Sequence, residues 1–139
     1  MSECLFCAAV AGSVSVNAVL SSATSFAFLD HRPVFKGHVL VVPRAHVPVL
    51  ADLPETDVGP FFRDVQRLAA AVEVGLDAAG TFVAINNRVS QSVPHMHAHV
   101  VPRTKGDGLR GFFWPRSRYS SPEEMERVRA AIVQEMEGG

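Results

Sequence analysis

The sequence has little net charge, few cysteines and no long apolar run. Its 13 Lys and Arg nearly balance 14 Asp and Glu, and the formal net charge of −1 gives no global attraction to nucleic acid or to a membrane surface. No apolar stretch is long enough to span a membrane, and the N-terminus lacks the basic start of an export signal. We therefore expect a cytoplasmic protein with no membrane or nucleic-acid partner.

Internal repeats, low-complexity runs and convincing linkers are also absent from the sequence. A length of 139 residues suits one compact domain and is too short for two. Hydrophobic residues make up 47% and charged residues 19%, a composition that can bury a core. We predict one domain over 1–139, with a C-terminal tail and helix at 104–137.

The two cysteines stand close together, as Cys4-Leu5-Phe6-Cys7. This spacing lets both thiolates bind one tetrahedral zinc ion. A thioredoxin-like redox motif needs a strand ahead of it, and the three preceding residues leave no room for one. Two ligands are half a zinc site, so further ligands must come from elsewhere, and a chance placement of the cysteines stays an open alternative.

Three of the six histidines, His95, His97 and His99, lie within five residues. On a β-strand, side chains two residues apart point to one face. The histidines would therefore share a face, while the apolar residues between them pack in the core. This pattern favours a strand that carries chemistry on one face; a metal-binding strand or a simple polar face is the alternative.

A strand is also predicted at Ser25–Asp30, where Phe26, Phe28 and Asp30 share one face. The carboxylate could accept both hydroxyls of a ribose while an aromatic ring flanks the base. Alternatively, Phe28 belongs to the core and Asp30 only opens the next turn.

Two further strands are predicted at 37–43 and 81–86. The first is nearly all apolar, so we expect it to be central in its sheet. The second leads through the loop 87–94 into the histidine strand, which predicts an antiparallel pair. That loop brings amide, hydroxyl and backbone donors beside the histidines, as a phosphoryl group requires, although Asn and Ser are also common turn residues.

The main helical region is 53–79. Apolar residues recur there at helical spacing, at Phe61 or Phe62, Val65, Leu68, Ala69, Val72 and Leu76. Because proline is poorly tolerated inside a helix, we expect a turn at 55–59, a long helix starting near Pro60 and a stop at Gly80. A second helix is expected after Ser121, with Glu124 completing a capping box. Its apolar stripe is Met125, Val128, Ile132 and Met136.

The stretch from Gln91 to Arg103, Gln-Ser-Val-Pro-His-Met-His-Ala-His-Val-Val-Pro-Arg, resembles the signature of the histidine triad (HIT) family of nucleotide hydrolases and transferases. The Gly37-His38 strand and the later His46 fit the same pattern. The resemblance runs from Cys4 to about Trp114, and the Cys-x-x-Cys start is similar to the zinc-containing branch.

The resemblance implies an α+β fold with a five-stranded antiparallel sheet and two helices. It also implies a homodimer with a continuous ten-stranded sheet, in which a tail such as Trp114-Pro115 reaches the partner's active site. A structural zinc would be held by Cys4, Cys7, His46 and His95.

The resemblance also implies residue roles. His97 would attack the α-phosphate and form a nucleotidyl-histidine, His99 would bind phosphate oxygens, and His38 would support the cluster. Ser92 would donate to the leaving-group oxygen. The implied contacts with a purine nucleotide are Phe28, Asp30, Asn86, Gln91, Ser92, His97 and His99. Ser90 stands where the family usually has Gly, which leaves open whether Asn86 or Asn87 faces the phosphate; we prefer Asn86.

The expected function is cleavage of a nucleoside 5′-phosphate derivative, either a phosphoramidate or a dinucleoside polyphosphate. Five basic residues against one acid between Arg103 and Arg118 slightly favour a polyphosphate, with Arg103 and Lys105 as candidate contacts, although a solvated loop is an equal reading. A non-catalytic nucleotide-binding scaffold and a catalytic metal enzyme built on the histidine strand are the competing hypotheses.

Overall fold

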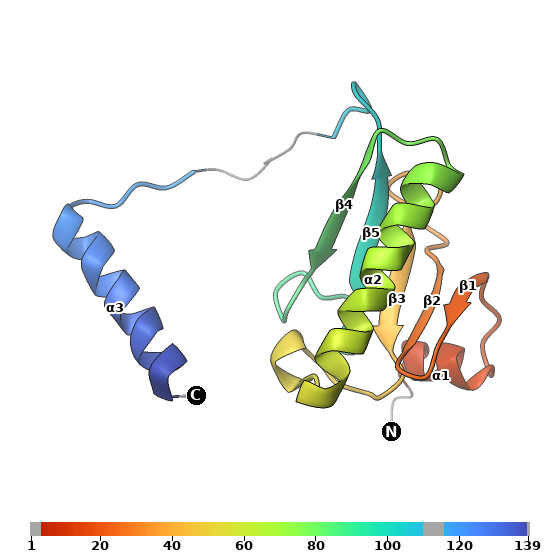
Figure 1. Cartoon of the computed structure of the whole chain (residues 1–139), viewed down its shortest axis with the longest axis horizontal. Helices are drawn as coiled ribbons and strands as arrows, with labels where there is room; N and C mark the ends of the chain where they lie inside the picture. The colour runs from red at the N-terminus through yellow and green to blue at the C-terminus, as the bar shows by residue number, and fades with distance from the viewer. Residues whose placement is uncertain (1–3, 110–115, 139) are drawn as a thin grey trace. The chain divides into compact units, whose positions relative to one another are not determined.

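The computed structural model describes residues 4–109 and 116–138 (Figure 1). The chain forms two compact units, residues 1–107 and 108–139. The predicted partner-reaching tail at Trp114 and Pro115 lies outside the described residues.

A five-stranded antiparallel sheet with the strand order β1-β2-β3-β5-β4 forms the centre of the first unit. The strands are β1 Ala18–Ser21, β2 Ser25–Leu29, β3 Val39–Pro43, β4 Gly80–Ile85 and β5 Ala98–Arg103. The predicted α+β class, the antiparallel sheet and the pairing of β4 with β5 are confirmed. β1 was not predicted, because its four residues are mostly exposed and show no clear alternation.

The described residues form three α-helices, α1 Leu5–Ala11 and α2 Glu55–Gly75 in the first unit and α3 Pro122–Gly138 in the second, and a short 3-10 turn at Leu50–Asp52. The two predicted helices correspond to α2 and α3. The additional helix, α1, occupies the segment that holds both cysteines, which was predicted only as a metal-binding turn.

The long helix begins at Glu55, so the prediction of a separate turn at 55–59 is wrong. Pro60 lies inside α2 and costs the carbonyl of Thr56 its usual helical donor. Gly59 precedes it, and a residue without Cβ removes much of the clash that keeps pre-proline residues out of the helical region. A single lost hydrogen bond is therefore tolerated.

The end of α2 also differs from the prediction. The helix stops at Gly75, and Gly80 is the first residue of β4. Between them, Asp77 has a left-handed φ of 52°, and the Ala78 N–H donates to the carbonyl of Glu73 at 2.9 Å. The backbone thus closes the helix without a glycine at the left-handed position.

The predicted apolar stripe of α2 is largely confirmed, with Phe61 rather than Phe62 fully buried. Leu76 lies just beyond the helix and is half-exposed. Asp64 is buried on the same face and accepts a hydrogen bond from Ser22 Oγ at 2.6 Å. This carboxylate was not predicted in the core. Its burial is tolerable because the Ser22 hydroxyl in the β1–β2 turn donates to one oxygen and Arg67 Nη1 donates to the other at 3.3 Å.

The sheet separates two apolar layers. Val39 and Val41 of β3 pack with α2 in one cluster, whereas Leu40 and Val42 pack with Phe6 of α1 in the other. Because successive strand residues face opposite sides, β3 is buried on both faces, as its apolar sequence predicts. Helix α2 lies across one face (Figure 1), and α1 covers the other, where the histidines also lie.

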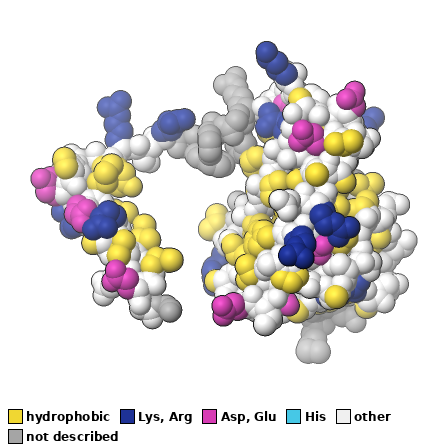
Figure 2. All heavy atoms as spheres, in the orientation of Figure 1, with side chains coloured by type: hydrophobic (Ala, Val, Ile, Leu, Met, Phe, Trp, Pro, Cys, Tyr) yellow, Lys and Arg dark blue, Asp and Glu magenta, His cyan; other side chains and the backbone are white. Residues whose placement is uncertain are grey.

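The second unit consists mainly of α3. The predicted N-cap is confirmed, since Ser121 Oγ accepts from the Glu124 N–H at 3.1 Å. The return bond differs from a capping box: the Glu124 carboxylate accepts from the N–H of Ser120, one residue before the cap, at 2.7 Å. The helix buries none of its residues. Figure 2 shows apolar side chains gathered along it, and the predicted stripe is 41–77% exposed at Met125, Val128, Ile132 and Met136. Among the described helices, none combines the length and the apolar character needed to cross a bilayer.

Candidate active site and metal centre

The three clustered histidines keep their alternation although the strand begins later than predicted. β5 starts at Ala98, so His95 and His97 precede it. Pro43, at the end of β3, has no N–H to continue the ladder, and the Met96 N–H donates instead to the carbonyl of Val47 at 2.7 Å. The backbone stays extended enough to place the imidazole centroids of His97 and His99 5.0 Å apart.

His97 is held in one tautomer by the backbone. Its Nδ1 lies 2.9 Å from the carbonyl oxygen of His95. A carbonyl only accepts hydrogen bonds, so Nδ1 carries the proton and Nε2 keeps its lone pair. The side chain is 3% exposed, and the imidazole lines a pocket. The result is an oriented imidazole whose Nε2 is available as a nucleophile.

A second hydrogen-bond chain orients His99. The Val34 N–H donates to Nδ1 of His38 at 3.1 Å, so the proton of His38 is on Nε2. That nitrogen donates to Nδ1 of His99 at 3.0 Å. His99 must then carry its own proton on Nε2, where it can be donated to a ligand.

Both members of this chain are neutral at physiological pH. Burial, together with the neighbouring His97 and His38, lowers the pKa of His99 to about 4. Burial also lowers the pKa of His38, against the opposing effect of the Asp30 carboxylate. Neutral imidazoles are what the directional chain from Val34 to His99 requires.

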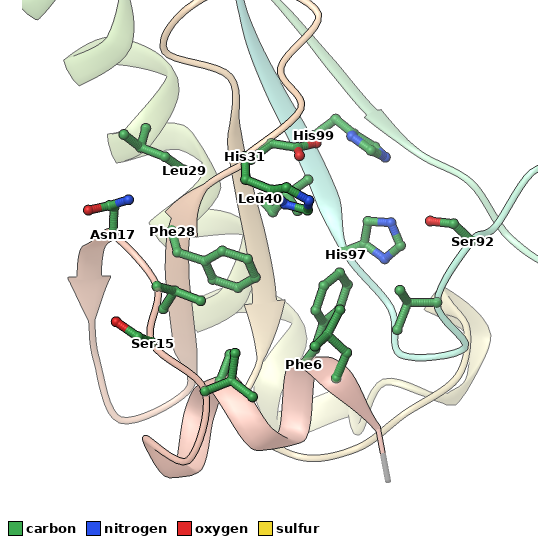
Figure 3. Close-up of a pocket in the computed structure, with 16 residues that line it drawn as sticks. Phe6, Ser15, Asn17, Phe28, Leu29, His31, Leu40, Ser92, His97 and His99 are labelled. Atoms are coloured by element: carbon green, nitrogen blue, oxygen red, sulfur yellow. The ribbon is translucent and has the colours of Figure 1, made fainter. Parts of the chain in front are cut away.

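The histidines open on a cavity of about 410 Å³ (Figure 3), within the usual range for small-ligand pockets. The lining brings together five of the predicted residues: Phe28, Asp30, Ser92, His97 and His99. It also includes Leu5, Phe6, Ala9, Val14, Ser15, Val16, Asn17, Leu29, His31, Leu40 and Val93, which were not predicted as site residues. Most of these are apolar and come from α1 and the segment that follows it, so the unpredicted helix explains why they were missed.

Asp30 opens the turn after β2, as one of the two alternatives has it, and it also lines the pocket. One carboxylate oxygen accepts from the Arg32 N–H at 3.0 Å, which forms the turn after β2. The other lies 3.8 Å from Nδ1 of His38, too far for a hydrogen bond. Asp30 therefore opens the turn and still presents an oxygen to the pocket.

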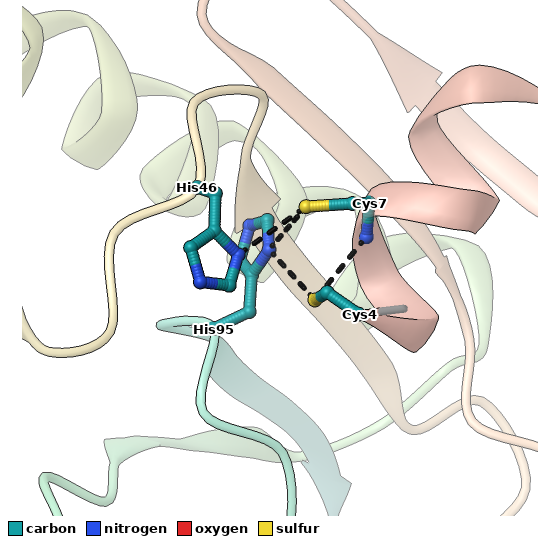
Figure 4. A group of neighbouring side chains, drawn as sticks. All are labelled: Cys4, Cys7, His46 and His95. Carbon is teal, nitrogen blue, oxygen red and sulfur yellow. Dashed lines mark hydrogen bonds between the residues drawn. The ribbon is translucent and has the colours of Figure 1, made fainter. Parts of the chain in front are cut away.

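Four side chains converge on a point beside this pocket (Figure 4): Cys4 and Cys7 from the start of α1, His46 from the loop after β3, and His95. Their candidate ligand atoms all lie within 4.8 Å of one another. Nδ1 of His95 is 3.4 Å from Cys4 Sγ and 3.5 Å from Cys7 Sγ, and Nδ1 of His46 is 3.2 Å from Cys7 Sγ.

This cluster fits a zinc ion. Tetrahedral bonds of about 2.3 Å to sulfur and 2.0–2.1 Å to nitrogen place neighbouring ligand atoms about 3.6 Å apart. The remaining ring nitrogen of His95 lies 2.8 Å from the Pro43 carbonyl, an arrangement that orients a metal-binding imidazole. Burial lowers the pKa of His95 and favours the neutral, ligating form. Two thiolates and two imidazoles would fill a closed site and leave no position for a substrate.

The sequence profile of the HIT domain matches residues 12–106. The chain belongs to the HIT family. Among its relatives is an adenosine 5′-monophosphoramidase of Schizosaccharomyces pombe, 31% identical over 94% of this chain and 96% of that protein.

Solved HIT structures share the whole fold. A HIT family protein from Bacillus subtilis is 29% identical, with a TM-score of 0.86 over 96% of both chains. A zinc-bound histidine triad protein from Mycobacterium smegmatis is 35% identical, with a TM-score of 0.73 over 99% of this chain and 98% of that chain. The predicted family is confirmed, and a zinc-bound neighbour agrees with the metal-binding character of the Cys/His cluster.

In this HIT protein, two predicted nucleotide contacts lie outside the described pocket lining. The side-chain amide of Gln91 donates to the Pro48 carbonyl at 2.6 Å, and its oxygen accepts from the Arg88 N–H at 2.8 Å. Asn86 is exposed at the end of β4. Asn87 instead accepts from the Leu50 N–H at 2.8 Å. Gln91 and Asn87 therefore fasten the loop 87–94 to the segment that follows His46.

That loop is strained at the position where the family usually has glycine. Ser90 has a φ of 60° and Arg88 a φ of 68°, both in the left-handed region that disfavours residues with a Cβ. Ser90 therefore carries a backbone strain that a glycine at this position would avoid.

The basic segment begins away from the pocket. Arg103 Nε binds the Asp107 carboxylate at 2.6 Å, and Arg103 ends β5, four residues beyond His99. At about 3.3 Å per strand residue, this is about 13 Å of chain. Neither Arg103 nor Lys105 is part of the described lining, so the structure gives no support to the predicted contact with a polyphosphate.

Proposed function

We propose that this protein is a nucleotide hydrolase or transferase that cleaves at the α-phosphate of a nucleoside 5′-phosphate derivative. The observation that carries the proposal is the tautomer of His97: the His95 carbonyl holds the proton on Nδ1 and leaves the Nε2 lone pair for attack. The pocket beside it has the size of a nucleotide site.

The reaction takes two displacements. In the first, Nε2 of His97 bonds to the α-phosphorus, and the bond to the leaving group breaks. The departing atom takes a proton from solvent, while the Ser92 hydroxyl, which lines the pocket, donates a hydrogen bond to it. In the second, water attacks phosphorus, the nitrogen–phosphorus bond breaks, and the released proton goes to solvent. Splitting one displacement into two is the advantage of nucleophilic catalysis.

The other pocket residues bind and orient the nucleotide. The Nε2–H of His99, fixed through His38, donates to a non-bridging phosphate oxygen. Asp30 accepts from the ribose hydroxyls, and Phe28 lies against a purine base. Asn86 would reach the phosphate from the end of β4, and Gln91 contributes by holding the loop that carries Ser92.

A phosphoramidate or a similar small leaving group fits this pocket better than a polyphosphate. No Lys or Arg occurs in the described lining, whereas a polyphosphate carries several charges that need cationic partners. The similarity to a relative named as an adenosine 5′-monophosphoramidase supports the same choice.

The test is turnover of adenosine 5′-phosphoramidate beside diadenosine tetraphosphate, with a mass-spectrometric search for an adenylyl adduct on His97. We expect faster turnover of the phosphoramidate and an adduct at that residue. The His97→Gly variant should bind nucleotide without turning it over. A wild-type protein that binds AMP but cleaves neither compound would indicate a non-catalytic binding protein instead.

We also propose that the zinc is structural. When bound, the zinc would cross-link α1, through Cys4 and Cys7, to the segment before β5, through His95. Metal analysis should give one zinc per chain and little in a Cys4→Ala variant. If a chelator abolished turnover while the fold and the nucleotide affinity were unchanged, a catalytic metal would be indicated. The two free thiols need a reducing compartment to stay available as ligands, which supports a cytoplasmic location.

We further propose that the whole chain, 1–139, works as one HIT-like domain within a homodimer. β4 is the last strand in the sheet order, and pairing of its outer edge with a second copy of the chain would extend the sheet to ten strands. The exposed apolar stripe of α3 also calls for a covering surface. Light scattering after size exclusion should give twice the 15.0 kDa chain mass.

A further inference from the structure

Phe6 stands between the two cysteines, and its ring reaches both the metal cluster and the nucleophile. The ring is 5% exposed. Its centroid lies 6.0 Å from that of His95, 5.0 Å from that of His97 and 5.6 Å from that of Phe28, and all three contacts are edge-to-face. One side chain thus contacts a candidate zinc ligand, the candidate nucleophile and the candidate base-binding ring.

The helix that carries Phe6 has little stability of its own. α1 has seven residues, and isolated helices shorter than about 12–15 residues are marginal in water. Its N-cap is Cys4, whose Sγ accepts from the Cys7 N–H at 3.4 Å. Within the described chain, α1 is fastened to the β-sheet by its buried residues, Phe6 and Ala9, and by the two thiols facing His46 and His95.

The same helix forms a wall of the nucleotide pocket. Leu5, Phe6 and Ala9 all line the cavity, and Figure 3 shows the Phe6 ring beside the imidazole of His97. Any change that loosens the start of α1 therefore loosens both the pocket wall and the packing around His97.

We propose that metal binding at the Cys4–Cys7–His46–His95 cluster and nucleotide binding in the pocket are energetically coupled, with Phe6 as the positioning residue that links them. This inference rests on the proposed nucleotide site and adds a regulatory property to it. The metal fixes α1, and α1 holds Phe6 against His97 and Phe28. Binding coupling is reciprocal, so a bound nucleotide must tighten metal binding by the same factor with which metal tightens nucleotide binding.

The experiment measures the zinc affinity of the full-length protein by chelator competition, with and without saturating AMP. Wild type is compared with Phe6→Leu, which keeps every candidate ligand, and with Phe62→Leu as the matched control. Phe62 lies on α2, is 36% exposed and packs edge-to-face on Phe61. In wild type and Phe62→Leu, AMP should tighten zinc binding about tenfold, within the usual range of allosteric coupling. In Phe6→Leu, this factor should fall to near one.

The outcomes separate the inference from the proposed function. If AMP does not bind the zinc-loaded wild type, both fail. If AMP binds but leaves the zinc affinity of wild type unchanged, only the coupling is refuted, and this result needs no variant to fold. A Phe6→Leu protein that keeps the wild-type factor would refute the role of Phe6. A merely structural role would weaken zinc binding equally with and without AMP, and would leave the factor intact.

Discussion

Replacing His38 tests the hydrogen-bond chain that orients His99. In the His38→Phe variant, the ring still fills a position that is 3% exposed, but Nδ1 of His99 loses its donor. His99 is then free to place its proton on either nitrogen, and only one of the two tautomers donates to phosphate. One neutral hydrogen bond is worth about 0.5–1.5 kcal/mol, which corresponds to a decrease of about 2–13-fold in kcat/KM for adenosine 5′-phosphoramidate.

The His38→Gln variant is the matched comparison, because its side-chain amide can still donate to His99. The Gln variant should recover part of the kcat/KM that the Phe variant loses. If the substitutions acted only through stability, kcat/KM of each variant would instead fall in proportion to the drop in its unfolding midpoint. Steady-state kinetics and denaturant unfolding of the same preparations separate the two. The hydrogen-bond chain would be refuted by a folded His38→Phe protein with wild-type kcat/KM, or by equal values for the Phe and Gln variants.

Three further predictions concern stability. Ser90→Gly should raise the free energy of unfolding by up to about 1 kcal/mol in urea titrations, because glycine adopts the φ of 60° without a Cβ clash, offset by its larger unfolded-state entropy; a lower urea midpoint would contradict this. Gly37→Ala should lower the free energy of unfolding by about 1–3 kcal/mol in the same urea titrations, since Gly37 has a φ of 102° and the new Cβ would lie 2.1 Å from Leu76 Cδ1. The pKa of His99 is lowered from 6.5 to about 4, chiefly by burial, so as pH falls through this interval the unfolded chain binds a proton at His99 before the folded chain does, and the free energy of unfolding decreases. The His99→Asn protein should lose less of its free energy of unfolding between pH 6.5 and 4. Parallel plots of that free energy against pH for the two proteins would disprove the lowered pKa of His99.

Strand alternation made much of the site predictable from the sequence. Three alternating histidines next to core residues required a sheet with one chemical face, and the apolar β3 required burial on both faces. The Cys-x-x-Cys spacing by itself predicted only half of a metal site, and the other two ligands, His46 and His95, came from the resemblance to the HIT family. The strand predictions, in contrast, depended on a local pattern that a single element imposes.

The features that were missed depend on contacts that the local pattern does not contain. Helix α1 is too short to show a periodic stripe, and its stability comes from Phe6 packing on residues more than 20 positions away. Pro60 was predicted to start the helix because proline is poorly tolerated inside one. Gly59 relieves part of the backbone clash before the proline, and the apolar pattern does not reveal this effect. Gln91 was expected at the phosphate, yet its amide is used by Pro48, 43 residues earlier in the chain. Tertiary partners decided the cases of α1 and Gln91, and a neighbouring glycine decided the case of Pro60.

The burial of β3 on two faces has a consequence for how sequence change affects this protein. Val39 and Val41 pack under α2, while Leu40 and Val42 pack on the α1 side, and Leu40 also lines the pocket. Adjacent positions therefore contact different parts of the molecule. In a scan of all substitutions along β3, odd-numbered positions should change how much folded protein accumulates, and Leu40 should change which nucleotide is preferred. A substitution that reshapes the pocket at Leu40 can thus leave the packing of Val39 and Val41 under α2 unchanged.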